Sequence, residues 1–327
     1  MHYSVVRQQP VTALLTLAVI AAVAFARFYM SPFDDEFITG APAPLAIFID
    51  GWQAAHMLWG VVLSAVITVL TGMTIGRMGA KFGIYSTQCI FSVPLYGLVA
   101  CGIFISENSL SAAIASFFAA SALRHLCGGY FRGQNLTAML YAGLCIGTIP
   151  MFCAAGAVYV LTAVIAMFLF ALSVREIVVL TSGILVVPLT VCYVCWAFGG
   201  EFLAPLQRLF DALTVPSGYT VWDSDPVAAL VLSGLTGFAV LCSVALFPSN
   251  KYSIATKSRS ILIYIIISCV FSIAIFLLPS ADVSFFALAA VPAALVMPII
   301  FLKSGETAAL MLYILFIAAF TAHLFIR

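Results

Sequence analysis

Apolar runs of membrane-spanning length recur along the whole chain and are separated by short polar connections. A transmembrane helix needs about 20 predominantly apolar residues. The run over 136–173 is too long for one helix, and Pro150 with the Cys153–Gly156 stretch predicts a break near its middle. The pattern then predicts an all-α bundle of about 11 transmembrane helices. The ranges are 11–29, 54–74, 84–106, 109–124, 136–152, 155–173, 177–199, 226–247, 260–279, 284–302 and 307–326.

The composition agrees with this pattern. Hydrophobic residues make up 64% of the 327 residues and charged residues only 8%, against about 25% charged in an average soluble domain. A soluble chain could not hide that much apolar surface, so lipid must be the solvent. A net charge of +1 and the lack of any Lys/Arg run exclude a polybasic nucleic-acid-binding protein. We expect a single transmembrane bundle over residues 1–327.

The basic residues fall on alternate connections, which predicts the orientation of the bundle. Cytoplasmic connections of membrane proteins are enriched in Lys and Arg. The alternation places the N-terminus in the cytoplasm and the C-terminus on the extracytoplasmic side. Ten of the thirteen Lys and Arg residues then face the cytoplasm: Arg7, Arg77, Lys81, Arg124, Arg132, Arg175, Lys251, Lys257, Arg259 and Lys303. Among the carboxylates, only Glu176 and Glu306 fall on that side.

Two longer connections, 30–53 and 200–225, are predicted on the extracytoplasmic side. The first is expected to be a non-helical loop over 29–51, because its proline and glycine residues favour turns, and it ends in a short apolar stretch over 45–49. In the second, apolar residues recur at helical spacing between Glu201 and Leu213. That spacing predicts a short amphipathic helix lying on the membrane surface.

Three adjacent carboxylates in the first loop are the strongest candidates for chemistry. Asp34, Asp35 and Glu36 follow the first apolar span closely. A carboxylate can act as a general base, and carboxylate oxygens also suit a hard divalent cation. We therefore take all three as candidate catalytic residues, with Asp34 and Asp35 as candidate ligands of a divalent cation. An acidic loop is also an ordinary solvated surface, and the sequence leaves both interpretations open.

Other polar residues on the same side are candidates for binding a substrate. Arginine recognises phosphate well, and histidine exchanges protons near neutral pH. The candidate substrate-binding or lipid-phosphate-binding residues are Arg27, His56, Arg208, Tyr219, Asp223 and Asp225. Simpler interpretations exist as well, since Arg27 can extend its side chain to the membrane surface and His56 lies between two tryptophans at that level.

The nine cysteines lie in or beside apolar spans. Disulfides need an oxidising aqueous environment, so we expect these thiols to be small buried hydrophobic side chains. Cys192 and Cys195 have redox spacing, but no basic neighbour is present to favour a thiolate. The N-terminal span is too long for a cleaved signal peptide and is expected to remain as the first transmembrane helix.

Three segments within residues 7–200 carry a resemblance to a known family. Arg7–Pro10 leads into the first span, Leu140–Gly147 leads to Pro150, and Ala171–Glu176 opens the next span with a Ser-x-Arg-Glu element. These segments resemble an uncharacterised family of polytopic inner-membrane proteins from the Bacteroidetes phylum. The resemblance implies a bacterial inner (cytoplasmic) membrane protein and carries no established activity.

The position of Asp34, Asp35 and Glu36, just after the first span, is similar to that of acidic residues in GT-C membrane glycosyltransferases. These enzymes use polyprenyl-phosphate sugars, so the resemblance implies that one carboxylate deprotonates the acceptor or holds a metal. Arg27 or Arg208 would then neutralise the departing lipid phosphate. Many members of that superfamily carry a large C-terminal soluble domain, which is not expected in this sequence. Two alternatives stay open: a transporter or lipid flippase, and a non-catalytic subunit that assembles with other envelope proteins.

Overall fold

The computed structural model describes residues 10–30, 43–85, 89–103, 109–133, 135–214, 226–250, 255–274 and 286–325. These residues are helical, apart from short links and turns, and no β-strand occurs among them. The all-α class expected from the apolar runs is confirmed. The helices are α1 (Pro10–Met30), α2 (Ala46–Ala55), α3 (Met57–Lys81), α4 (Ser92–Ile103), α5 (Ser109–Arg132), α6 (Leu136–Phe152), the 3-10 helix η2 (Ala154–Ala157), α7 (Val158–Leu169), α8 (Val174–Ala197), α9 (Ala204–Thr214), α10 (Pro226–Asn250), α11 (Thr256–Ala274), α12 (Phe286–Val296), α13 (Pro298–Lys303) and α14 (Glu306–Phe325).

Six of the described helices are long and apolar enough to cross a membrane. They are Pro10–Arg27, Met57–Lys81, Leu110–Arg132, Val174–Ala197, Thr256–Ile273 and Phe286–Lys303. The other five predicted ranges overlap shorter apolar helices. These helices are Ser92–Gly102, Leu136–Phe152, Ala154–Leu169, Val231–Phe247 and Glu306–Ala322. The arrangement is therefore that of a helical membrane protein, and the count of eleven spans stays a prediction.

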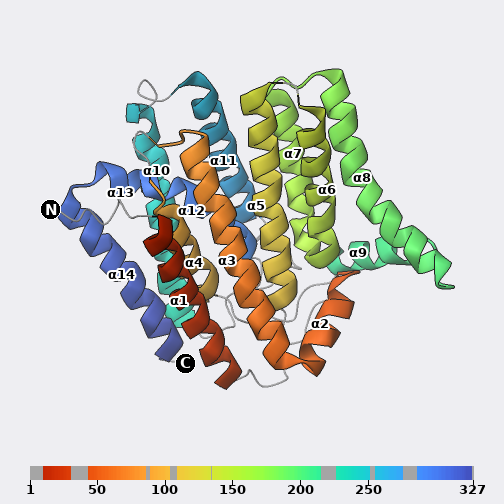
Figure 1. The fold of residues 1–327 in the computed structure, drawn as a ribbon, viewed down its shortest axis with the longest axis horizontal. Coiled ribbons are helices and arrows are strands. Elements are labelled where there is room, and N and C mark those ends of the chain that lie inside the picture. Colours follow the sequence, from red (N-terminus) through yellow and green to blue (C-terminus); the bar gives the residue numbers. More distant parts are fainter. Residues whose placement is uncertain are drawn as a thin grey trace.

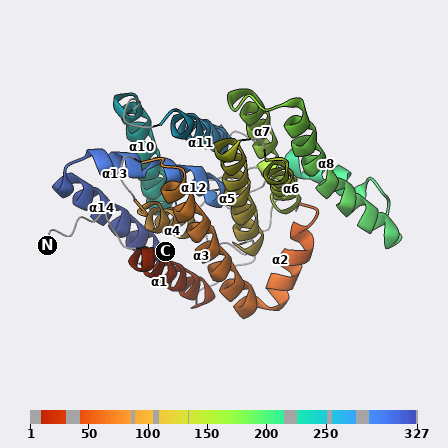
Figure 2. The same cartoon turned by 45° about the horizontal axis from the view of Figure 1, so that its top comes forward.

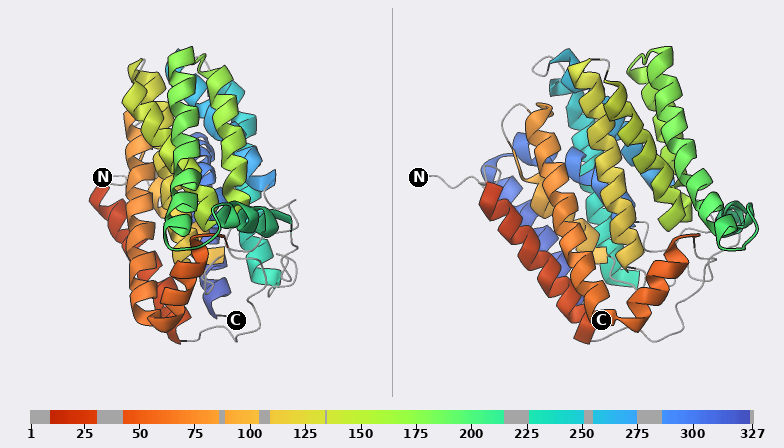
Figure 3. Two further views of the ribbon diagram at one scale, coloured as in Figure 1. Left: turned by 90° about the vertical axis from the view of Figure 1, so that its right-hand side faces the viewer. Right: turned by 45° about the vertical axis from the view of Figure 1, so that its right-hand side comes forward.

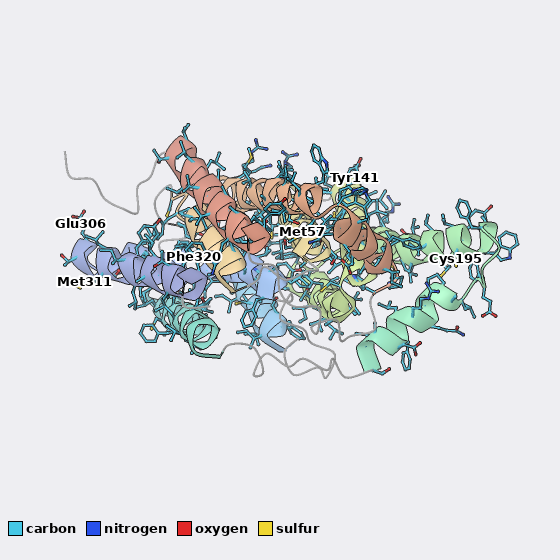
Figure 4. All side chains as sticks on the ribbon, turned by 90° about the horizontal axis from the view of Figure 1, so that it is seen from below. Met57, Tyr141, Cys195, Glu306, Met311 and Phe320 are labelled. Atoms are coloured by element: carbon cyan, nitrogen blue, oxygen red, sulfur yellow. The ribbon has the colours of Figure 1, made fainter. Side chains whose placement is uncertain are left out.

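The centre of the bundle is α12, which packs against α3, α4, α5, α10 and α11 (Figure 1). Every residue from Ala287 to Val296 is buried. Such a helix is apolar on all sides because it has no face toward lipid or water. The helices α1 and α14 form one flank and α8 forms the other (Figure 1). Seen from below, Glu306 and Met311 of α14 lie at one side and Cys195 of α8 at the opposite side (Figure 4).

Small residues bring α6 and α8 into backbone contact. A Cβ atom added to Gly143 would lie 2.3 Å from the Leu180 carbonyl oxygen, and one added to Gly147 would lie 2.4 Å from that of Ile184. Gly183 of α8 lies in the same contact, since a Cβ added there would lie 2.8 Å from the Leu140 carbonyl oxygen of α6. Glycines at i and i+4 allow this approach, as in other membrane helix pairs. The Leu140–Gly147 segment thus has a structural reason for its glycines.

Several boundaries differ from the sequence-based ranges. Helix α5 continues to Arg132, beyond the predicted end at 124, and α3 continues to Lys81, beyond 74. Both sequence-based ranges end at or just before an arginine, Arg77 in α3 and Arg124 in α5, whereas the helices continue past it. The end of the loop expected to be non-helical forms α2, so residues 46–51 are helical. The predicted break in 136–173 is confirmed, since α6 ends at Phe152 and η2 follows.

The start of α8 is fixed by a capping box. The Ser173 side chain accepts a hydrogen bond from the Glu176 backbone N–H, and the Glu176 carboxylate accepts one from the Ser173 backbone N–H at 2.8 Å. Such a box satisfies N–H groups that have no partner within the helix. This explains why the Ser-x-Arg-Glu element opens the helix, three residues earlier than the predicted start at 177.

Four basic residues lie at one end of the bundle. The C-terminal ends of α3 and α5 and the N-terminal ends of α6, α8 and α11 lie at the upper end in Figure 1. The last residue of α1, the α2–α3 junction and the start of α10 lie at the lower end. The sequence therefore puts Lys81, Arg132, Arg175 and Lys257 at the upper end and Arg27 at the lower end. This separation agrees with the alternation expected from the sequence.

The nine cysteines are each buried or partly buried. Cys192 and Cys195 both belong to α8 and form no disulfide. Their burial agrees with the expectation that these residues serve as small hydrophobic side chains.

Candidate functional site

The end of the first long connection is anchored to the bundle at the start of α2. The Leu45 backbone N–H donates a hydrogen bond to the Met151 carbonyl oxygen at 2.9 Å, and Ala43 and Ala46 are buried. Asp34, Asp35 and Glu36 lie outside the described residues. Their roles as catalytic residues or ligands of a divalent cation stay predictions.

The second long connection meets the first at this point. Helix α9 buries Ala212, which packs in one cluster with Ala43, Ala46 and Ala154. Leu209 and Leu213 of α9 pack against that cluster. The alanines allow α9, η2 and the start of α2 to approach closely. The two connections that the sequence placed on one face are therefore in contact through their described parts.

Gln53 holds α2 against the start of α5. Its side chain is 3% exposed, and its Oε1 accepts a hydrogen bond from the Leu110 backbone N–H at 3.1 Å. That N–H belongs to the first turn of α5, where backbone donors lack helical partners. Gly60 makes room for this side chain, because a Cβ there would lie 2.6 Å from the Gln53 Cγ. The junction of α2 and α3 is therefore a fixed corner (Figure 2).

Helix α9 is the short helix that the apolar spacing predicted, and it lies crosswise to the upright helices (Figure 3). Its buried residues are Pro205 and Ala212, while Leu206 and Phe210 are exposed on another face. Arg208 is also exposed. Tyr219, Asp223 and Asp225 lie outside the described residues, so their proximity to Arg208 stays a prediction.

Arg27 joins two helices at the lower end. Its Nε donates a hydrogen bond to the Leu324 carbonyl oxygen at 3.1 Å. The last carbonyls of a helix lack helical partners, and a nearby cation stabilises them. Arg27 therefore links the end of α1 to the end of α14. This structural role accounts for an arginine here without requiring a lipid phosphate.

His56 is the residue at which the chain turns from α2 into α3. Its backbone N–H donates to the Trp52 carbonyl oxygen at 2.9 Å, and its ring meets the Trp52 ring edge-on with centroids 5.6 Å apart. The side chain is exposed. It is thus accessible at the lower end, on a different element from Arg27 and Arg208.

The described residues contain no group of three or more His, Cys, Asp or Glu side chains that could hold a metal. The carboxylates considered for a divalent cation, Asp34 and Asp35, fall outside that search.

A broken helix lies in the core. Pro292 has no N–H, so the Leu288 carbonyl loses its helical partner, and the Tyr159 hydroxyl donates to that oxygen at 3.0 Å. The Met297 carbonyl, at the break before α13, accepts a hydrogen bond from the Ser243 hydroxyl at 3.2 Å. The Tyr159 hydroxyl thus satisfies a carbonyl that Pro292 frees, while the Ser243 hydroxyl ties the link between α12 and α13 to α10.

The sequence-based interpretation missed two polar residues inside a helix. Arg124 was placed in a connection, but α5 extends to Arg132 and carries Arg124 and His125 within it. The signal was present, because the apolar residues Leu126, Cys127, Tyr130 and Phe131 continue the helical pattern beyond Arg124.

Comparison with known proteins identified no matching family model, no matching curated protein and no matching solved structure.

Proposed function

We propose that the chain is a multi-pass protein of the bacterial inner membrane, with about 11 spans and a cytoplasmic N-terminus, that acts in envelope biogenesis. In this proposal it transfers a sugar from a polyprenyl phosphate, as GT-C glycosyltransferases do. The observation that carries the proposal is the contact between Ala43 and Ala46 at the end of the acidic connection and Ala212 of α9. That contact joins the end of the connection that carries Asp34, Asp35 and Glu36 to α9, which exposes Arg208.

The roles follow from the chemistry of sugar transfer. An acceptor hydroxyl must lose a proton, and Asp34, Asp35 or Glu36 would accept it. The lipid phosphate leaves with negative charge, and Arg208 would stabilise it. Arg208 suits this role better than Arg27, because the Arg27 Nε is already hydrogen-bonded to the Leu324 carbonyl.

An apolar surface leads toward Arg208 from the flank of the bundle. The end of α8 exposes Tyr193, Trp196 and Phe198, with 89% of Phe198 exposed. The connection into α9 continues this surface through Phe202 and Leu203. A polyprenyl chain could lie along it while its phosphate reached Arg208, since exposed apolar side chains of a membrane protein face lipid tails.

A transfer assay on the purified protein tests this proposal. The protein would be placed in vesicles with a set of polyprenyl-phosphate sugars, and release of polyprenyl phosphate would be measured. Arg208→Gln should reduce release, and Arg208→Lys should restore it only in part because the bidentate fork is lost. Glu306→Gln, an exposed carboxylate change on α14, serves as the control. Release that is equal in all variants would refute the role of Arg208.

One observation favours a transporter or lipid flippase as the second candidate. Broken helices mark substrate sites in many secondary transporters, and α12 and α13 form such a broken helix here. However, the hydroxyl groups of Tyr85 and Ser243 already donate to the carbonyls of Leu295 and Met297 at the break. A substrate would have to displace them, so the transfer reaction is the better-supported proposal.

A further inference from the structure

The upper end of α5 presents two arginines on one helical face. Arg124, Gly128 and Arg132 are spaced four residues apart, so they lie on successive turns of one side. Arg132 is exposed and Arg124 is partly buried. Gly128, between the two arginines, carries no side chain, so a neighbouring helix can approach there.

The end of α3 fills this space between the arginines. A Cβ added to Gly128 would lie 3.8 Å from the Cζ atom of the Phe82 ring. The Lys81 Nζ lies 5.8 Å from the centroid of the same ring. The Lys81 ammonium group is therefore held beside the face of α5 that carries the two arginines.

Helix α11 brings a fourth cation to the same place. The Phe82 and Phe131 rings are in contact, with centroids 5.8 Å apart. The Lys257 Nζ donates a hydrogen bond to the Phe131 carbonyl oxygen at 3.2 Å. We call Lys81, Arg124, Arg132 and Lys257 the basic cluster. Three helices that are distant in the sequence supply it.

The electrostatics of the basic cluster are unbalanced. The guanidinium groups of Arg132 and Arg124 both repel the Lys81 ammonium group. The carboxylate of Glu176, at the same end of the bundle, is hydrogen-bonded to the Ser173 hydroxyl at 2.8 Å. A concentration of like charges is unfavourable, and an anion bound among them would relieve the repulsion.

The helix ends explain only part of the basic cluster. Lys81 and Arg132 lie in the last turns of their helices, where a cation is stabilised by the helix dipole. Arg124 lies eight residues before the end of α5, about 12 Å along the axis at 1.5 Å per residue. An ionised group at that depth in an apolar helix is costly and marks a functional site by default.

We propose that the basic cluster binds a phosphate group, carried by an anionic lipid headgroup or by a soluble phosphate compound. The planar Arg124 and Arg132 side chains suit phosphate oxygens, and the lysines add point charges. The site lies at the end opposite the proposed transfer site and does not depend on it.

Thermal unfolding of the full-length protein in neutral detergent tests the proposal. Phosphatidylglycerol, phosphatidylcholine and inorganic pyrophosphate would be added separately. Phosphatidylglycerol or pyrophosphate should raise the unfolding temperature in a concentration-dependent way, and phosphatidylcholine should raise it less. A rise with pyrophosphate alone assigns a soluble phosphate, and a rise with phosphatidylglycerol alone assigns a lipid.

The decisive variant is the double change Lys81→Gln with Arg132→Gln. Both side chains are exposed, so the change removes charge while leaving the core intact. The apparent affinity for the active anion should fall about tenfold or more for each cationic side chain that is removed. The matched control, Arg175→Gln with Arg259→Gln, removes two charges from the same end outside the basic cluster and should keep the response. Equal responses in the two double variants, or no response of the wild type to either anion, would overturn the proposal.

Discussion

Replacing Gly147 by alanine should separate α6 from α8. The added Cβ would lie 2.4 Å from the Ile184 carbonyl oxygen and 3.1 Å from its carbonyl carbon. These are backbone atoms of a helix, so no side-chain rotation can relieve the clash. The helices must move apart or tilt, and the close approach that α6 and α8 share along Gly143 and Gly183 must loosen with them.

The magnitude follows from two opposing effects. Inserting a methyl group into a fully packed interface costs about 1–3 kcal/mol. Glycine to alanine in a helix also gains about 0.5–1 kcal/mol of helix propensity when space is free. Gly237 of α10 is a helical glycine with free space around it, because nothing lies within 4 Å of an added Cβ. The gain in helix propensity applies at both positions and cancels in the comparison, so we expect Gly147→Ala to be about 1–3 kcal/mol less stable than Gly237→Ala.

Unfolding in mixed micelles with increasing dodecyl sulfate measures this difference directly. The two variants and the wild type would be compared by circular dichroism under the same conditions. The expected order of stability is Gly237→Ala, then wild type, then Gly147→Ala. If Gly147→Ala unfolds at the same dodecyl sulfate fraction as Gly237→Ala, the close packing of α6 against α8 is wrong.

Two further substitutions test the hydrogen bonds that hold the fold. Tyr159→Phe should lower the free energy of unfolding by about 1–3 kcal/mol, because it leaves the buried Leu288 carbonyl without its donor. Tyr193→Phe, at an exposed tyrosine, is the control and should change the free energy of unfolding little. Equal effects of the two substitutions in denaturant titrations would argue against the role of Tyr159. Ser173→Ala should cost about 1 kcal/mol by removing the α8 cap. Ser182→Ala, on an exposed face of the same helix, is its control in the same titration, and an equal decrease in both would count against the cap.

The helical class and the approximate positions of the helices could be predicted because the apolar runs are long and nearly continuous. The break after Phe152 was also predictable, since Pro150 and Gly156 flank it. What the sequence could not provide was the packing of distant segments against each other. Nothing local to Ala43 indicates that it packs with Ala212, because alanine fits almost any close helix contact.

The ends of the helices were harder to predict for a physical reason. A charged residue inside a membrane helix is costly, and the sequence-based range for α5 ends at Arg124. In the structure α5 continues past Arg124, and Phe82 and Lys81 from α3 lie against the same face. Residues at the end of α3 thus cover part of this face of α5, a contact that the local sequence does not reveal. The candidate carboxylates of the first connection lie outside the described residues, and their function remains a prediction from the sequence.

The most direct test of the proposed transfer site is a measurement of envelope glycans in cells that carry the triple change Asp34→Asn, Asp35→Asn and Glu36→Gln. A positioned general base contributes about 10²- to 10⁴-fold in rate. The variant should therefore lose the glycan while it reaches the membrane at wild-type abundance, because these residues lie outside the apolar spans. Normal glycans at normal abundance would contradict the proposal and show that the three carboxylates are a solvated surface.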